Sequence, residues 1–176
     1  MRTVDSIRIA APVERVFQAA VDVEQWPARL SHYRWVRMLE RQEQGGLVEM
    51  AAWRPFGVFN YPTWWVSEMR VDRPGLAVHY RHVRGITTGM DVVWQLQPLE
   101  GGTGVTIVHR WSGPRWPLVG PSAANWVIGP VFIHGIASRT LAGIAKYVES
   151  NSGEAGKRGS GASHDTAVPP YRRTAP

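Results

Sequence analysis

Six consecutive segments of this chain alternate apolar and polar residues, and a short turn separates each segment from the next. The segments cover residues 33–44, 47–55, 61–72, 77–84, 89–98 and 104–111. The connections include Gly45-Gly46, Pro74-Gly75 and Gly101-Gly102, and connections this short join antiparallel strands. The pattern therefore predicts a six-stranded antiparallel meander, which restricts the chain to folds built on one sheet.

The flanking residues complete the expected α+β fold. Residues 3–9 alternate like a first strand. Pro12 suits the first turn of a short helix, and a second helical segment follows at about residues 23–29. From about Asn125 to Ser150, apolar residues recur at i, i+3 and i+4. One helix cannot cover a flat seven-stranded sheet, so we expect a curved sheet that wraps around this helix and leaves a cavity.

The length of 176 residues suits one domain with a sizeable core. We expect this ligand-binding domain to span residues 1–150. Residues 151–176 consist mainly of Gly, Ser, Ala, Pro and Arg with few large apolar side chains, so we expect a disordered tail there.

Charge and composition narrow the function classes. The net charge is +6, but the basic residues are scattered among acids, whereas a nucleic-acid site needs a clustered stripe. The absence of cysteine excludes disulfides, thiolate catalysis and cysteine-based metal sites. Asp5 lies where a secretion signal would be apolar, so we expect a cytoplasmic protein that binds no nucleic acid.

The stretch from Trp116 to Ser138 lacks acidic and basic residues other than histidine, and its length is that of a membrane span. Pro117, Pro121 and Pro130 interrupt it, so we expect a loop that leads into a buried helix. Contact of this loop with a membrane surface stays open as an alternative.

Strand periodicity assigns four polar side chains to the concave face, because residues two apart point the same way. They are Arg54, Tyr80, His82 and His109. An imidazole can move an enol proton near neutral pH, and a guanidinium or phenol can stabilise an enolate oxygen in a dry cavity. We predict these four as catalytic residues, while a purely structural role for each histidine stays open.

A second set is predicted to line the cavity and bind the substrate, because aromatic and apolar walls favour a flat unsaturated molecule. Its members are Trp53, Trp64, Met90, Trp94, Trp111, Ile133, Ala137 and Leu141. The adjacent Trp64 and Trp65 must point to opposite faces, so periodicity predicts that one of the two meets the cavity.

Other patterns do not indicate a catalytic or metal site. His79 and His82 are three apart on a strand, which sends their rings to opposite faces, so we expect no metal. Gly101-Gly102-Thr103-Gly104 precedes a strand and is a hairpin turn rather than a phosphate loop. No Ser/His/Asp arrangement is evident.

Three segments resemble the START/polyketide cyclase-dehydrase (SRPBCC) superfamily, whose members have the helix-grip fold. They are IAAPVERVFQAAVDVEQWP at 9–27, GITTGMDVVWQL at 85–96 with GTGVTIVH at 102–109, and RTLAGIAKYVE at 139–149. The resemblance covers roughly residues 3–150 and is strongest to bacterial polyketide cyclase-like members. It implies a ligand cavity and does not specify the ligand, because the shared residues are mostly structural.

The resemblance implies a cofactor-free enzyme that binds a polyketide-type intermediate and guides aldol cyclisation and aromatisation. Its partners would be this hydrophobic molecule and an acyl carrier protein that delivers it, and the protein would be a monomer or homodimer. Two alternatives stay open, namely a non-catalytic carrier of a lipid, quinone or other hydrophobic metabolite, and a regulatory subunit of a biosynthetic complex.

Overall fold

The computed structural model describes residues 1–56, 59–112 and 134–159, and its central element is one antiparallel sheet. Within these residues the strand order is β1-β7-β6-β5-β4-β3-β2, with every neighbouring pair antiparallel. The strands are β1 (Arg2–Ile9), β2 (Tyr33–Gln42), β3 (Gly45–Phe56), β4 (Phe59–Asp72), β5 (Ala77–Gly85), β6 (Asp91–Leu99) and β7 (Gly102–Arg110). The predicted six-stranded meander, β2 to β7, and the predicted seven-stranded antiparallel sheet are confirmed.

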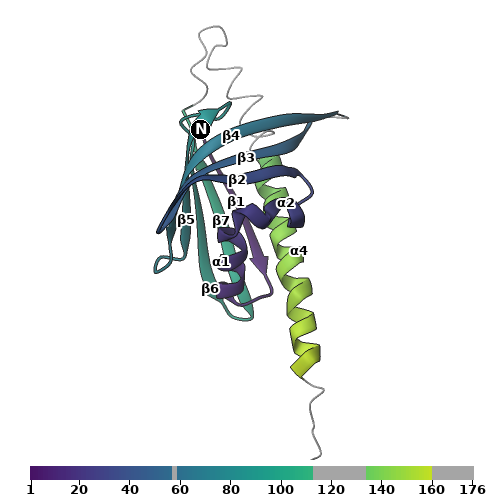
Figure 1. Ribbon diagram of the computed structural model, residues 1–176. Coiled ribbons are helices and arrows are strands. Elements are labelled where there is room, and N and C mark those ends of the chain that lie inside the picture. The colour runs from purple at the N-terminus through teal and green to yellow at the C-terminus, as the bar shows by residue number, and fades with distance from the viewer. Residues whose placement is uncertain (57–58, 113–133, 160–176) are drawn as a thin grey trace, which may run out of the picture.

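The helices lie on one side of this sheet (Figure 1). They are α1 (Val13–Val21), the 3-10 turn η1 (Val23–Gln25), α2 (Trp26–Arg29) and α4 (His134–Gly159). The long helix α4 packs against β1, β3, α1 and α2, which gives the predicted helix-grip arrangement. None of the helices described is long and apolar enough to cross a membrane.

The C-terminal helix differs in extent from the sequence-based expectation. Its predicted first turns, residues 125–133, lie outside the described residues. At its other end α4 continues to Gly159, so the predicted domain boundary at residue 150 falls inside a helix. The boundary itself stays a prediction.

The core lies between the concave face of the sheet and the helices. Inward residues of the central strands are almost fully buried, as Val78, Leu96 and Ile107 illustrate, and α4 contributes Leu141 and Ile144. Burial of this apolar area drives the sheet to close on the helix.

The sheet is irregular where it bends. Register shifts interrupt β2–β3 twice and β4–β5 once, between Val66 and Ser67. Next to the latter shift, Gly85 has a φ of +96° and pairs with Trp65. Such bulges increase local twist and change the direction of side chains, and this one lies beside the cavity described below.

Candidate functional site

A cavity lies between the concave face of the sheet, α2 and α4. The centre of a water-sized sphere can reach about 60 Å³ of it. Its lining consists of Trp26, Tyr33, Met50, Arg54, Trp65, Tyr80, His82, Met90, Val92, Trp94, Ile107, His109, Ile136, Ala137 and Thr140. Sites for drug-sized ligands usually have about 300–1,000 Å³, so this space matches one end of a large ligand rather than all of it.

One positively charged side chain, that of Arg54, is buried in the lining of the cavity. Arg54 on β3 is 5% exposed, and its Nε donates a hydrogen bond to Oγ1 of Thr63 at 3.2 Å. Burial lowers the pKa of Arg54 to about 9, so the guanidinium keeps its charge at neutral pH. No residue in the described lining is acidic, and the guanidinium of Arg54 can therefore attract an anion or stabilise a developing negative charge in the cavity.

Two histidines line this interior, and each is held by a threonine. The Nδ1 of His82 lies 2.6 Å from Oγ1 of Thr87, and the Nδ1 of His109 lies 3.2 Å from Oγ1 of Thr3. Burial, followed by the neighbouring charges, lowers the pKa of His82 to about 3 and that of His109 to about 4. Both rings are therefore neutral near pH 7, and Nε2 is the atom left to meet a ligand.

Two tyrosines supply phenol groups. Burial raises the pKa of Tyr33 to about 12 and that of Tyr80 well above its usual range, so both hydroxyls stay protonated. The neighbouring side chain of Thr140 on α4 offsets part of the rise in the pKa of Tyr33. The buried hydroxyl of Tyr80 has no partner in the described part of the chain, although buried polar groups are normally hydrogen-bonded. A ligand oxygen would satisfy it.

Aromatic rings form the walls. The ring centroids of Trp26 and Trp94 are 5.6 Å apart, and Trp26 meets Tyr33 edge-on at 5.1 Å. The indole of Trp65 stacks on the imidazole of His82 at 5.9 Å with an interplanar angle of 13°. These flat surfaces suit a planar unsaturated ligand.

The structure brings together all four residues predicted as catalytic, because Arg54, Tyr80, His82 and His109 line the cavity. Among the predicted substrate-binding residues, Met90, Trp94 and Ala137 line it as well.

Other predicted substrate-binding residues lie elsewhere. Trp111 and Leu141 are buried beside the cavity without lining it, and the Nε1 of Trp111 donates a hydrogen bond to the carbonyl of Thr88 at 3.0 Å. Ile133 lies outside the described residues. Trp53 and Trp64 belong to the outer face of the sheet, where they are 40% and 39% exposed.

The placement of Trp53 and Trp64 in the cavity is therefore corrected. Arg54 points inward, so its neighbour Trp53 must point outward. The indole Nε1 of Trp64 donates a hydrogen bond to Glu49 on the outer face, and Trp65 lines the cavity instead.

Sequence reasoning missed several lining residues. Trp65 pairs with Met50, which shares a face of β3 with the predicted inward residue Arg54, so knowledge of the hairpin register would have identified Trp65. Trp26, Tyr33 and Thr140 reach the cavity from α2, the start of β2 and α4, and no local pattern indicates that these three segments converge.

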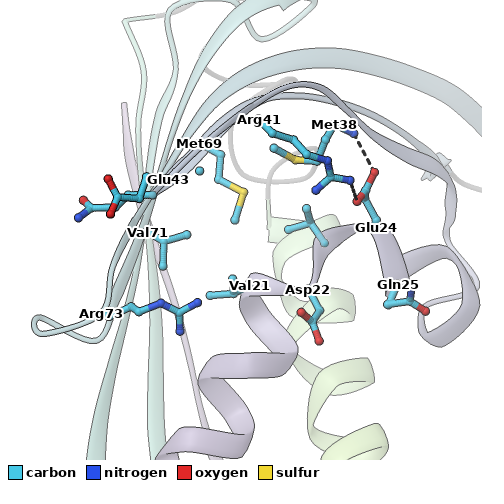
Figure 2. Close-up of a pocket in the computed structure, with 13 residues that line it drawn as sticks. Val21, Asp22, Glu24, Gln25, Met38, Arg41, Glu43, Met69, Val71 and Arg73 are labelled. Atoms are coloured by element: carbon cyan, nitrogen blue, oxygen red, sulfur yellow. Dashed lines mark hydrogen bonds and ion pairs between the residues drawn. The ribbon is translucent and has the colours of Figure 1, made fainter.

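A larger hollow lies at the other end of β2–β4, beside α1, and Figure 2 shows its lining. Its volume is about 300 Å³, but its charged groups include an ion pair between Glu24 and Arg41 with N–O separation of 2.5 Å. The amide of Met38 also donates a hydrogen bond to Glu24, and these contacts lower the pKa of that carboxyl. Because these charges satisfy each other, we place the candidate site in the smaller inner cavity.

No group of three or more metal-ligating side chains occurs among residues 1–56, 59–112 and 134–159. The polar residues of the cavity are thus suited to hydrogen bonding, proton transfer and stabilisation of an oxyanion.

Comparison with known proteins gives one consistent family. The profile described as "Polyketide cyclase / dehydrase and lipid transport" matches residues 9–127. Two Streptomyces proteins provisionally named as polyketide cyclases are similar. The S. cyaneus protein is 35% identical over 103 residues, which are 57% of this chain. The match spans 66% of the S. cyaneus protein, just under two thirds of its length. The S. halstedii protein is 33% identical over 116 residues, covering 62% and 95%.

Solved structures agree on the fold. The Zhui aromatase/cyclase of Streptomyces sp. R1128 superposes with a TM-score of 0.76 at 17% identity, covering 89% of this chain and 98% of that one. A protein from Thermus thermophilus gives a TM-score of 0.73 at 19% identity, covering 86% and 99%. Identities this low support the shared fold and leave the chemistry to be argued from the cavity.

Proposed function

Because this chain belongs to the polyketide cyclase/dehydrase and lipid transport family, we propose that it binds the reacting end of a polyketide-type intermediate and promotes aldol cyclisation with loss of water. The observation that carries this proposal is the joint presence in one aromatic cavity of a charged guanidinium, two neutral imidazoles and a phenol with no partner among the described residues. The names of the Streptomyces relatives support the substrate class.

In the proposed reaction, Nε2 of His82 or His109 takes a proton from the carbon between two ketones. The resulting enolate oxygen receives hydrogen bonds from Arg54 and Tyr80, which stabilise its negative charge. The enolate carbon attacks a second ketone carbon of the same chain, and the new alkoxide takes the proton back from the imidazolium, which gives a hydroxyl and a neutral imidazole. Removal of a second α-proton and departure of that hydroxyl as water then leave a carbon–carbon double bond.

The depressed histidine pKa values fit a base that must start neutral. A ring with a pKa of about 3 or 4 is neutral throughout the physiological range, so the unprotonated form is always present. Such a ring is a weak base in isolation, and the proposal therefore assigns most of the rate enhancement to positioning and to oxyanion stabilisation by Arg54 and Tyr80.

The cavity size defines how the substrate lies. About 60 Å³ accommodates the atoms that react and not a whole polyketide chain, so the remainder would extend beyond the lining residues. Delivery on an acyl carrier protein is compatible with that arrangement and belongs to the proposal.

The test uses a linear poly-β-ketone thioester and product analysis by liquid chromatography and mass spectrometry. We expect Arg54→Met, Tyr80→Phe and at least one of His82→Asn and His109→Asn each to reduce cyclised product about 10²-fold or more, as loss of one oxyanion donor or catalytic base does elsewhere. His79→Asn on the neighbouring outward position is the matched control. Unchanged cyclisation in all four folded variants would disprove the site.

A second function, carriage of a hydrophobic metabolite without chemistry, is favoured by the lipid transport part of the family description. Under this proposal Arg54 and Tyr80 would bind the polar end of the cargo. The carrier function predicts a lipid or quinone that co-purifies with the protein and is released by denaturation, with no product formed from the thioester.

A further inference from the structure

A cluster of tryptophan and arginine side chains lies on the outer face of β2–β4, away from the cavity. We call it the arginine–tryptophan face, and it consists of Arg34, Trp35, Arg37, Trp53 and Trp64. Two of the tryptophans in this cluster, Trp53 and Trp64, are exposed, at 40% and 39%. No described helix covers this side of the sheet (Figure 1).

The face is ordered by contacts between its own side chains. The guanidinium of Arg34 lies over two indoles, 4.7 Å from the ring centroid of Trp35 and 4.6 Å from that of Trp53. The guanidinium of Arg37 lies 5.8 Å from the ring centroid of Trp35. Because these contacts hold the arginines in place, binding an anion costs them little additional side-chain entropy.

The carboxylate of Glu49, which contacts this cluster, is already engaged. Glu49 accepts hydrogen bonds from Nε1 of Trp35 at 3.3 Å and from Nε1 of Trp64 at 2.7 Å. It thereby fixes both indoles, and among the described residues it forms no ion pair with Arg34 or with its cross-strand neighbour Arg37. No ion pair between residues that the structure describes involves Arg34 or Arg37, so the N–H groups at the edges of both guanidinium groups can bind an external anion.

The rest of the outer face differs in character. On β5–β7 and the adjoining end of β4 it carries Glu68, Arg70, Arg81, Asp91 and Arg110, with Arg81 and Asp91 paired at 3.6 Å. Acids and bases alternate there as on an ordinary solvated surface. Exposed indoles beside guanidinium groups that form no ion pair with any described residue are thus local to the arginine–tryptophan face.

We propose that the arginine–tryptophan face docks on the surface of an anionic lipid bilayer. Indole is the side chain most suited to the membrane interface, because its ring prefers the hydrocarbon boundary while its N–H prefers the polar layer. Arginine beside it attracts lipid phosphates, and the association weakens with salt. An acidic protein would need only the arginines for binding. The exposed indole area is suited to a bilayer, so we favour the bilayer as the partner. This docking is independent of the cavity chemistry.

Co-sedimentation with vesicles tests the proposal. The vesicles are phosphatidylcholine with or without phosphatidylglycerol, at low and at physiological salt. We expect binding to the anionic vesicles, with loss of about 30-fold in Arg34→Gln/Arg37→Gln, since each basic residue near an anionic surface strengthens binding about fivefold. Trp53→Ala/Trp64→Ala should also weaken binding and should abolish the blue shift of tryptophan fluorescence on vesicle addition.

Two matched variants control for general loss of charge or apolar surface. Arg70→Gln/Arg110→Gln removes two exposed arginines elsewhere on the outer face, and Val4→Ala/Leu99→Ala removes two other exposed apolar side chains. Both should bind like the parent protein, and urea unfolding checks that every variant is folded. Absence of binding to anionic vesicles, or equal loss in the control variants, would overturn the proposal. Arginine-dependent binding to polyglutamate without vesicle binding would indicate an acidic protein partner instead.

Discussion

The hydroxyl of Tyr80 is buried in the cavity without a hydrogen-bond partner among the residues that the structure describes. Removal of an unsatisfied buried hydroxyl relieves its desolvation cost, so Tyr80→Phe should leave the free energy of unfolding unchanged or raise it by about 1 kcal/mol. The same substitution should lower cyclisation or ligand binding. Urea unfolding measured beside the product assay tests both. A loss of stability of about 1 kcal/mol or more would show that the hydroxyl has a structural partner in the protein.

Two buried histidines and the partly buried His32 make stability depend on pH. Burial, with neighbouring positive charge, lowers the pKa of His32 and His109 to about 4 and that of His82 to about 3, against about 6.5 in an unfolded chain. As pH falls below about 6.5, the unfolded chain takes up protons that the folded chain does not, so protons favour unfolding. Stability should be full above that pH and decline progressively toward pH 4.

Urea unfolding at pH 7.5, 6, 5 and 4.5 measures this decline. His82→Asn combined with His109→Asn should flatten it, because two of the groups that gain protons on unfolding are then absent. His79→Asn, on the outer face of β5, serves as the control and should retain the parent slope. A pH-independent free energy of unfolding in the parent protein would contradict the assignment of neutral buried imidazoles.

At the scale of the strand, periodicity predicted which side chains are buried. Met50, Arg54, Tyr80, His82, Trp94 and His109 all point to the concave face, as period two requires. It did not decide between Trp64 and Trp65, because that choice depends on the register of β4 against β3. Register is set by pairing between strands, and a single segment does not contain that information.

The turn between β5 and β6 offers a matched pair of glycines. Gly85 and Gly89 have φ values of +96° and +84°, which L-residues rarely adopt. A Cβ on Gly85 would lie 2.4 Å from the carbonyl oxygen of Trp64 and 2.8 Å from Cα of Trp65, whereas a Cβ on Gly89 would meet nothing within 4 Å. Only the first position combines backbone strain with a steric clash.

Gly89→Ala should therefore cost about 1 kcal/mol of stability, and Gly85→Ala about 2–4 kcal/mol. Because Trp65 forms a cavity wall, Gly85→Ala should also impair ligand binding at conditions where the variant is still folded. Thermal or urea unfolding of the two variants tests the difference. Equal costs at both glycines would mean that the clash is absorbed elsewhere in the sheet.

Helix α4 presents different faces to the cavity and to solvent. Ala137 lines the cavity at 4% exposure, whereas Ala142 faces outward. Ala137→Leu should occupy the cavity and abolish ligand binding while stability changes by no more than about 1–3 kcal/mol. Ala142→Leu should affect neither property. Retained binding in a folded Ala137→Leu variant would place the ligand outside this cavity.

For the whole molecule, the alternation of short strands and one amphipathic helix predicted a single sheet around a helix, and the structure confirms it. The position of the four polar cavity residues followed from the same pattern. The convergence of α2, β2 and α4 on the cavity did not, because tertiary packing between distant segments determines it. Neither the cavity volume nor the arginine–tryptophan face could be predicted from the sequence.

The walls of the cavity are mainly rings, supplied by Trp26, Tyr33, Trp65 and Trp94 among others. A ring is stiff and has two torsions, so it yields to a guest by turning to another rotamer and not by gradual compression. The space available to a guest should consequently change in discrete steps. Along a series of molecules of increasing size, affinity should fall abruptly at particular sizes, and each drop would report the reorientation of one indole or phenol.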